Sequence, residues 1–283
     1  CLDFMEKLDM SIIIPVKNDV RIVNCIKSVD ADVEIVVVFN GATEEFKHIV
    51  DEFNVTVVEL KEAGLSNAYN EGISKAKYGK ILLMDSDCVF TKGCIKKLYV
   101  GLEKAKLSKG NVKFLKETYI RNIVAKTREF TTSDFCNAFS PPLAFNKDIE
   151  ADIGYFFHPN LKWEEDWEFN LRVMKKGLKI YWDKTAIVYH PSLSIRSDLK
   201  SAFNYGIGHA QGTQMGVFGE EKELSFNVLI SATKTQFLYL KEQKGILAAI
   251  YYEIWKIAYR YGKTYQKRRY KNEKNFSDSP ASR

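Results

Sequence analysis

Cysteine pairs are the first feature that this chain of 283 residues lacks. Its five cysteines include no CxxC pair and show no regular spacing, and an odd number argues against a disulfide framework. We therefore expect a reducing, cytoplasmic setting. The sequence begins at Cys1 without a signal peptide, so we do not expect this residue to be a processed or lipid-modified N-terminus.

A glycine-rich loop is missing after the first predicted strand. Residues 11–16, Ser-Ile-Ile-Ile-Pro-Val, predict a buried strand that ends near Pro15. The next residues are Lys17-Asn18-Asp19-Val20-Arg21. A dinucleotide-binding fold needs glycines at this turn so that the backbone can approach a pyrophosphate. Their absence argues against NAD or FAD as a cofactor and against a nucleotidyltransferase.

A membrane-spanning run is also missing. Residues 201–219 carry no charge, but five glycines and several polar residues interrupt them, which argues against a membrane span. Within this stretch we expect residues 205–209, Tyr-Gly-Ile-Gly-His, to form a flexible loop beside a substrate site, on the side where an acceptor substrate would bind.

Apolar residues are numerous enough to form a large core. The chain is 46% hydrophobic and 13% aromatic, which excludes disorder and fits one domain with an appendage. Strands are predicted at 33–39 and 55–60, and helices at 20–29 and about 64–77. Since strands and helices alternate, the pattern predicts βαβ units and parallel strands. Residues 95–130 are expected to be helical and to carry no chemistry.

The strongest chemical signal is an apolar run that ends in two carboxylates. Residues 81–84, Ile-Leu-Leu-Met, predict a strand buried on both faces, and Asp85 and Asp87 follow at its carboxyl end. Ligands bind at this edge of parallel sheets, and two close carboxylates repel unless a cation lies between them. Oxygen ligands favour Mg²⁺ or Mn²⁺ over zinc. The alternative is a solvated acidic turn without function.

A second acidic cluster lies between two tryptophans, in the segment 163–168, Trp-Glu-Glu-Asp-Trp-Glu. Acids are costly to bury together unless one of them binds or reacts, although the first turn of a solvated helix also favours acids. A further apolar strand, 186–190, ends in His190. A lone terminal histidine is by itself more often a surface residue than a ligand.

Five segments taken together resemble glycosyltransferase family 2, a group of inverting nucleotide-sugar transferases with the GT-A fold. They are "SIIIPVKND", "VVVFNGATEE", "EAGLSNAYNEGISKAKYGKILLMDSD", "WEEDWEFNLRVMKKG" and "AIVYHP", in this order from about residue 11 to 192. The resemblance implies an α/β fold, a Rossmann-like mixed sheet flanked by helices, with a C-terminal helical extension. We expect an N-terminal tail at 1–10, the GT-A domain at 11–215 and the extension at 216–283.

The resemblance also implies roles for individual residues. It places the general base at Asp166 with Glu165 as its neighbour, and a divalent metal (Mn²⁺ or Mg²⁺) on Asp85, Asp87 and His190. The nucleotide sugar is expected at Pro15, Val16, Lys17, Asn18, Asn40, Gly64, Asn67, Asp85 and Ser86. The chain departs from the family pattern at Phe39, Tyr69 and Ser140-Pro141, where relatives usually carry an Asp, an Arg and a Gly-Gly pair.

The C-terminal segment is strongly basic. Residues 256–274 hold eight basic residues and one acid, Glu273. One predicted helical face is apolar and another is largely charged; the apolar residues are Leu247, Ile250, Tyr251, Ile254, Ala258, Tyr261 and Tyr265, and the charged ones are Glu253, Lys256, Arg260, Lys263 and Lys267. The pattern favours attachment to an anionic membrane surface. The alternative is a helix packed on the catalytic domain.

The combined interpretation is a cytoplasmic, peripherally membrane-associated glycosyltransferase that acts on a glycan or lipid-linked glycan in cell-surface polysaccharide assembly. A polyprenyl-phosphate sugar synthase would share the same core and differ in the acceptor. A non-catalytic basic membrane-binding protein is the alternative of another class. Nucleic acid is not expected as a partner, because no nucleic-acid-reading module is recognisable.

Overall fold

The computed structural model describes residues 6–219 and 226–277, and Cys1 therefore lies outside the described residues. The chain divides into two compact units. The first contains residues up to 115 together with 131–191, and the second contains 116–130 and the residues from 192 onward. The boundary expected near residue 215, between the GT-A domain and the C-terminal extension, stays a prediction.

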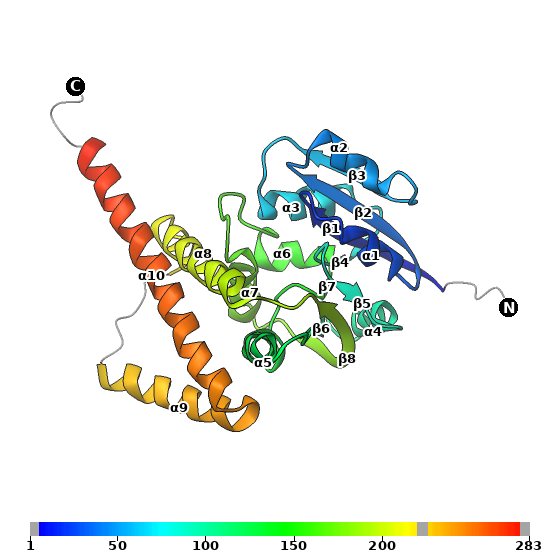
Figure 1. Cartoon of the computed structure of the whole chain (residues 1–283). Coiled ribbons are helices and arrows are strands. Elements are labelled where there is room, and N and C mark those ends of the chain that lie inside the picture. Colours follow the sequence, from blue (N-terminus) through cyan, green and yellow to red (C-terminus); the bar gives the residue numbers. More distant parts are fainter. Residues whose placement is uncertain (1–5, 220–225, 278–283) are drawn as a thin grey trace. The chain divides into compact units, whose positions relative to one another are not determined.

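A mixed sheet of eight strands forms the centre of the first unit, within the described residues (Figure 1). In spatial order the strands are β3 (Thr56–Leu60), β2 (Asp32–Asn40), β1 (Lys7–Val16), β4 (Lys80–Leu83), β7 (Leu143–Asn146), β6 (Leu107–Phe114), β8 (Ile180–His190) and β5 (Val89–Phe90). The first four are parallel, β7 is antiparallel to β4 and β6, and β8 is parallel to β6. Strands β1, β2, β4, β6 and β8 therefore end at one common edge.

The apolar runs found in the sequence form the middle of this sheet. The side chains of β1 from Ser11 to Val16 are buried, as are Ile81, Leu82 and Leu83 of β4, because helices cover both faces. Helix α3 (Leu65–Lys75) packs directly on the sheet at Gly72, where a Cβ atom would lie 2.4 Å from Ile13 Cγ2. The other helices of this unit are α1 (Ile22–Lys27), α2 (Glu44–Lys47), η1 (His48–Val50), α4 (Cys94–Gly101), η2 (Lys147–Ile149), α6 (Glu150–Ile153) and α7 (Glu165–Lys175).

Residues 95–130 are not the continuous helical stretch expected from the sequence. Helix α4 ends at Gly101, strand β6 follows, and α5 (Tyr119–Ser133) begins after it. Strand β6 was missed because Ser108, Lys109 and Asn111 are polar residues that the fold nevertheless buries.

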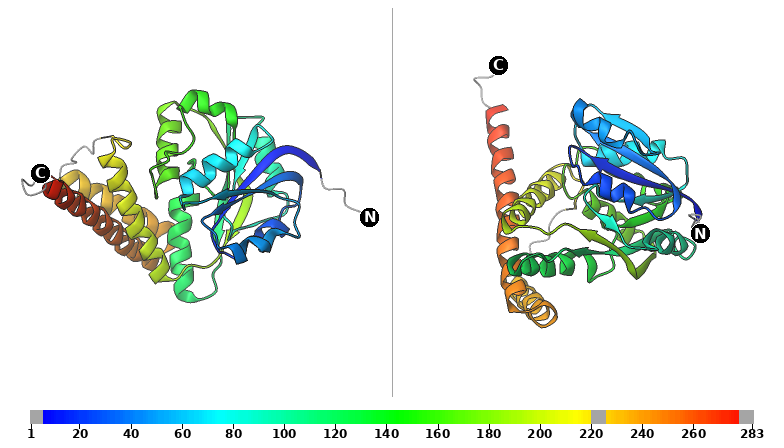
Figure 2. Two further views of the ribbon diagram at one scale, coloured as in Figure 1. Left: turned by 90° about the horizontal axis from the view of Figure 1, so that it is seen from above. Right: turned by 45° about the vertical axis from the view of Figure 1, so that its right-hand side comes forward.

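The second unit is helical. It contains α5 up to Phe130, α8 (Ile195–Gln214), α9 (Phe226–Lys244) and α10 (Ile246–Ser277). The expectation of a flexible loop at 205–209 is wrong, because these residues lie inside α8. Their glycines serve packing: a Cβ atom on Gly206 would lie 2.0 Å from the carbonyl oxygen of Tyr259 in α10, and one on Gly262 would lie 2.0 Å from that of Phe203. Figure 2 shows α8 and α10 side by side from two further directions.

Buried polar and apolar contacts hold α5, α8, α9 and α10 together. Phe130, Leu240, Ala249 and Tyr252 form an apolar cluster. Asp198, almost fully buried, accepts a hydrogen bond of 2.7 Å from the Tyr251 hydroxyl and lies 3.4 Å from Nε of Arg128. Tyr251 thus faces inward, unlike the exposed position that the sequence suggested. Within the described residues, no helix is both long and apolar enough to cross a bilayer.

Candidate active site

Amide side chains tie together the loops at the carboxyl edge of β1, β2 and β3. Asn18 Oδ1, just after β1, accepts a hydrogen bond of 3.0 Å from the backbone N–H of Thr43. Asn40, at the end of β2, accepts one of 2.7 Å from the N–H of Gly64, which caps α3. These predicted nucleotide residues, with exposed Lys17 next to Asn18, therefore share one rim. Pro15 and Val16 lie below this rim as buried residues of β1, whereas Asn67 is exposed in the first turn of α3 and Ser86 is half-buried after β4.

The turn after β4 places the half-buried carboxylate of Asp85 next to helix α3. Its Oδ1 accepts a hydrogen bond of 3.2 Å from the hydroxyl of Tyr69 on α3. Burial, followed by repulsion from Asp87, raises the pKa of Asp85 to about 7, although the Tyr69 hydrogen bond lowers it. The two carboxylates predicted from the sequence thus do repel each other, and a cation between them would relieve the repulsion.

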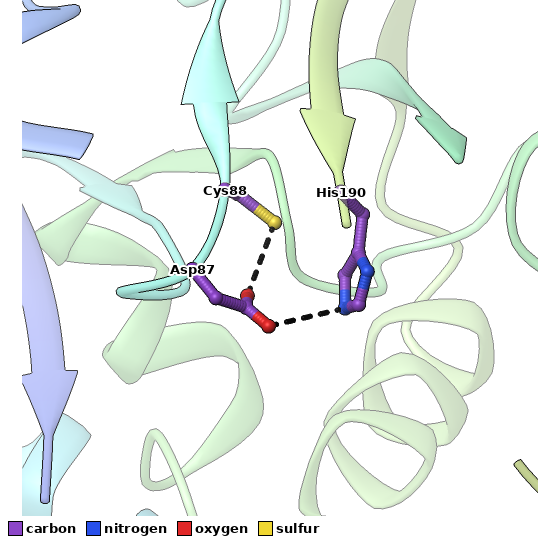
Figure 3. A group of neighbouring side chains, drawn as sticks. All are labelled: Asp87, Cys88 and His190. Atoms are coloured by element: carbon purple, nitrogen blue, oxygen red, sulfur yellow. Dashed lines mark hydrogen bonds and ion pairs between the residues drawn. The ribbon is translucent and has the colours of Figure 1, made fainter. Parts of the chain in front are cut away.

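Asp87 lies where β1, β4 and β8 end and contacts two cationic or basic side chains. Its Oδ2 is 3.4 Å from an Arg21 nitrogen and 3.7 Å from His190 Nε2 (Figure 3). Arg21 also binds Asp19 through hydrogen bonds of 2.5 to 3.1 Å. The structure therefore joins Asp87 with His190, residues about a hundred positions apart in the chain.

The orientation of His190 suits metal binding. Its Nδ1 lies 2.8 Å from the carbonyl oxygen of Pro191 and donates to it, which leaves Nε2 as the acceptor nitrogen on the side of Asp87. The ring packs on Phe114 at 4.7 Å between ring centroids. Fixing the ring through Nδ1 is the arrangement commonly found for histidines that bind metals through Nε2.

Asp87, Cys88 and His190 each offer one ligand atom, all within 4.8 Å of one another. Burial and the nearby carboxylates raise the pKa of the Cys88 thiol well above its usual range, and its Sγ lies 3.6 Å from Asp87 Oδ1. A protonated thiol is a poor ligand, so we assign Cys88 as a donor to Asp87. The remaining carboxylate and imidazole groups fit Mn²⁺ or Mg²⁺.

The second acidic cluster begins helix α7. Glu165 is almost fully buried, and burial together with Asp166 and Asp85 raises its pKa well above the usual range. Asp166 Oδ1 accepts a hydrogen bond of 2.7 Å from the N–H of Trp167. Both residues interact electrostatically with Asp85. The cluster after β4 and the start of α7 therefore belong to one charged site.

Glu168, the third acid of this turn, has a structural role. Its two carboxylate oxygens accept hydrogen bonds of 2.6 and 2.7 Å from Arg172, and one of them accepts a further hydrogen bond from Tyr155. Arg172 also donates to the carbonyl oxygens of Ile153, Tyr155 and Phe156. These contacts occupy Glu168 and leave Glu165 and Asp166 as the candidates for chemistry.

The sequence interpretation missed three polar neighbours of the site: Arg21, Tyr69 and Lys109. Arg21 lies just after a recognised motif, three residues beyond Asn18, and Tyr69 lies inside one, where it was noted only as a departure from the family pattern. Lys109 lies in the stretch that was expected to be helical and without chemistry. It is buried, and it interacts electrostatically with Asp85 and Asp166.

The model of glycosyl transferase family 2 matches residues 11–117, which include the Asp85-Ser86-Asp87 turn. An O-antigen biosynthesis glycosyltransferase of Escherichia coli, WbnJ, is 29% identical over 205 residues, which cover 66% of this chain and 78% of the relative. Residues 11–117 of this chain therefore match glycosyltransferase family 2. With the curated relative, this match identifies the chain as a nucleotide-sugar glycosyltransferase.

Solved structures support the fold of this glycosyltransferase. S. aureus TarS 1-349 in complex with UDP-GlcNAc has a TM-score of 0.53 at 16% identity, covering 71% of this chain and 66% of that one. Mannosyltransferase PcManGT from Pyrobaculum calidifontis, in complex with GDP-Man and Mn²⁺, has a TM-score of 0.57 at 15% identity, covering 86% and 73%. The chain spans just under two thirds of the TarS 1-349 fragment and 39% of the longer TarS chain. At these identities the likeness establishes the GT-A-like fold.

Proposed function

We propose that this enzyme is an inverting, metal-dependent glycosyltransferase that transfers a sugar from a nucleoside diphosphate to a hydroxyl group. One observation carries the proposal: Asp87 and His190 meet 3.7 Å apart, at the edge of the sheet where the Asp85 turn interacts with Glu165 and Asp166. The residues that would bind a divalent cation for the diphosphate and the residues that would act as a base thus lie at one site. The UDP-GlcNAc and GDP-Man complexes of the two structural neighbours support a nucleotide-sugar donor.

In the proposed reaction Asp166 accepts the proton of the acceptor hydroxyl while the acceptor oxygen forms a bond to the anomeric carbon. The bond between that carbon and the diphosphate oxygen breaks, and its electron pair leaves with the nucleoside diphosphate. Burial and Asp166 raise the pKa of Glu165, which favours its neutral form and so favours the negative charge on Asp166. Asp87, Asp85 and His190 would hold the divalent ion, which when bound offsets charge on the leaving diphosphate.

Donor hydrolysis, in which water replaces the acceptor, tests these roles without knowledge of the acceptor. A panel of nucleotide sugars is first screened for hydrolysis that depends on Mn²⁺. Asp87→Asn is expected to abolish Mn²⁺ binding measured by calorimetry and to abolish turnover. Asp166→Asn is expected to lower turnover by roughly 10² to 10⁴ while Mn²⁺ and nucleotide still bind. Asp183→Asn, at a half-buried position of β8 where the carboxylate accepts hydrogen bonds from Thr185, is the control.

Two outcomes contradict this proposal. Unchanged turnover of the wild type in the presence of EDTA would exclude the metal role. Near-normal turnover of Asp166→Asn would exclude Asp166 as the base, and Glu165→Gln would then be the next variant.

The acceptor that we propose is a glycan carried on a lipid, in cell-surface polysaccharide assembly. The likeness to an O-antigen biosynthesis glycosyltransferase supports this choice. A polyprenyl-phosphate sugar synthase has a phosphate rather than a hydroxyl as its acceptor. Offering the enzyme a polyprenyl phosphate and a polyprenyl-diphosphate sugar in parallel separates the two, because each is a substrate for only one of these activities.

An exposed apolar stripe on α10 supports attachment to a membrane surface. Six large apolar residues at spacings of three and four are each between 43% and 64% exposed; they are Leu247, Ile250, Ile254, Ile257, Tyr261 and Tyr265. Such spacing places them on one side of the helix. The opposite side of α10 is occupied by contacts to α8 and α9, and at the edge of the stripe the rings of Tyr261 and Tyr265 also pack on Phe203 of α8. The stripe therefore differs from the face predicted from the sequence, which included the buried Tyr251.

The charges beside the stripe favour an anionic lipid surface over a second copy of the chain. Residues 254–271 contain no Asp or Glu, whereas Arg260, Arg268 and Lys271 are exposed. Two copies packed along this helix would bring like charges together. An anionic leaflet would instead gain about 1 kcal/mol for each basic residue held near it.

Vesicle sedimentation tests the membrane proposal. Wild-type protein is expected to sediment with vesicles that contain phosphatidylglycerol, less so at 0.5 M salt because part of the attraction is screened, and hardly with phosphatidylcholine alone. Ile257→Ser, on the stripe, is expected to weaken sedimentation, whereas Leu238→Ser, at an exposed apolar position on α9, is the control. Equal sedimentation of both variants contradicts the proposal, as does a dimer in solution that Ile257→Ser disrupts.

A further inference from the structure

Lys109 is one of the few fully buried charged side chains in the described part of the chain, with 1% of its surface exposed. Lysine is almost never buried unless its ammonium group is paired. Here Nζ donates a hydrogen bond to the carbonyl oxygen of Phe139 and another, of 3.1 Å, to that of Pro141. The partners of Lys109 are thus backbone groups of the segment 139–142, which leads into β7.

The sheet brings Lys109 to the level of the acidic turn. In the strand register Lys109 of β6 pairs with Leu143 of β7, and Leu143 pairs with Leu83 of β4, two residues before Asp85. Burial lowers the pKa of Lys109 to about 7, while Asp166 and Asp85 act in the opposite direction by favouring its charged form. The Lys109 ammonium group is therefore close enough to interact electrostatically with Asp85 and Asp166, the two carboxylates on which the proposed chemistry depends.

The segment held by Lys109 also contacts the helix that carries Asp166. The ring of Phe139 packs against Trp167, the residue after Asp166, with 5.9 Å between ring centroids. The N–H of Ala138 donates a hydrogen bond of 2.8 Å to Asn170 Oδ1, one helical turn further along α7. The segment is therefore attached to β6 on one side and to the first turns of α7 on the other.

We propose that Lys109 is a positioning residue for sugar transfer, which fixes the segment 139–142 and through Phe139 and Trp167 holds Asp166 at the correct place relative to the donor. This inference rests on the proposed role of Asp166 as the base. Misplacement of a reacting group by about 1 Å costs about 10²-fold in rate. Loss of the two Lys109 hydrogen bonds frees the segment to move by such an amount.

The test compares Lys109→Met with Lys147→Met in the metal-dependent donor hydrolysis assay. Lys147 is a matched control, because its Nζ also donates to a backbone carbonyl, that of Ala76, and burial also lowers its pKa, but it follows β7 at the opposite edge of the sheet. Lys109→Met is expected to lower kcat about 10²-fold and to leave the KM of the donor and the affinities for UDP and GDP with Mn²⁺ unchanged. Lys147→Met is expected to change none of these.

Lys109→Arg, which keeps a cation with N–H donors, is expected to recover part of the lost kcat. Asn170→Ala loosens the same segment from the α7 side, so its effect and that of Lys109→Met are expected to be less than additive. Equal loss of donor affinity and kcat in Lys109→Met, or an equal loss of kcat in Lys147→Met, would overturn the inference. Asp166→Asn in the same assay separates the two proposals: if it retains turnover, the base assignment fails, whatever Lys109→Met does.

Discussion

At the scale of single residues, Asp85 combines a functional position with a structural cost. An unfolded chain ionises this carboxyl above about pH 4, whereas in the folded protein burial and Asp87 raise its pKa to about 7. Between these values the folded state binds a proton that the unfolded state has lost. The free energy of unfolding therefore falls as the pH rises from 4 to 7, and the full penalty is present above pH 7.

Asp85→Asn is accordingly expected to stabilise the protein in the absence of metal. The amide oxygen can still accept the Tyr69 hydrogen bond, and the charge of this half-buried side chain is gone. We expect a gain of about 1 to 3 kcal/mol in the free energy of unfolding at pH 8, and little gain at pH 4. Urea denaturation in EDTA at the two pH values measures this. A stabilisation of equal size at both values would show that the ionised carboxyl is not its cause.

Some residues of the site were recognisable from the sequence and others were not. Asp85, Asp87 and His190 could be found because each ends an apolar strand, where a polar side chain stands out. Lys109 could not, because a lysine inside a strand looks like any surface lysine until the fold brings Phe139 and Pro141 to its ammonium group. Long-range pairing of this kind leaves no local signal in the sequence.

At the scale of elements, the crossing of α8 and α10 depends on two glycines. Gly206 and Gly262 each leave room for the backbone of the other helix, and a Cβ atom at either position would lie 2.0 Å from a carbonyl oxygen. Backbone atoms cannot move aside as the end of a side chain can. The helices would have to separate, and the contacts beside the crossing, including the Tyr251 hydrogen bond to Asp198, would loosen.

Gly206→Ala is therefore expected to destabilise the protein although alanine favours helices. Overpacking of this kind typically costs about 1 to 3 kcal/mol, more than the roughly 1 kcal/mol that alanine contributes over glycine in a helix. Thermal unfolding followed by circular dichroism should show a lower Tm for Gly206→Ala than for the wild type. Lys200→Ala, at an exposed position on the same helix, should leave the Tm unchanged. A raised Tm for Gly206→Ala would mean that the helices do not approach this closely.

Gly206 and its neighbour Gly208 explain why residues 205–209 of α8 were expected to form a loop. Read locally, a segment with two glycines and no charge has a low helix propensity. The apolar strands β1, β2 and β4 and the helix α3 were predicted correctly, because burial on both faces, or on one side, leaves a regular pattern in the sequence. Helix α8 is determined by a partner about 50 residues later in the chain, which no local pattern reveals.

At the scale of the whole molecule, the second unit is assembled from two separate parts of the chain. Residues 116–130 pack with α8, α9 and α10, although residues 131–191 belong to the first unit. Thr127, for example, donates a hydrogen bond of 3.1 Å to the carbonyl oxygen of Ala248. Truncation of the C-terminal helices consequently affects residues in the middle of the sequence.

A chain that ends at residue 245 is expected to be unstable rather than merely detached from membranes. It would lack Ala249 and Tyr252, which pack on Phe130, and Tyr251, which binds the buried Asp198. Limited proteolysis should cleave such a chain within α5 and α8 under conditions that leave the full chain and the Ile257→Ser variant intact. Protection of α5 in the truncated chain would show that it is stable without α10.

The split composition of the second unit also has a consequence during synthesis. A ribosome adds about 5 to 20 residues per second, so residues 131–191, which separate the two parts of this unit, take roughly 3 to 12 s to make at that rate. The apolar side of α5 around Phe130 is finished long before α9 and α10 exist to cover it. Nascent chains of this enzyme therefore pass through an interval in which α5 presents uncovered apolar surface, and this helix is where we expect a chaperone to bind.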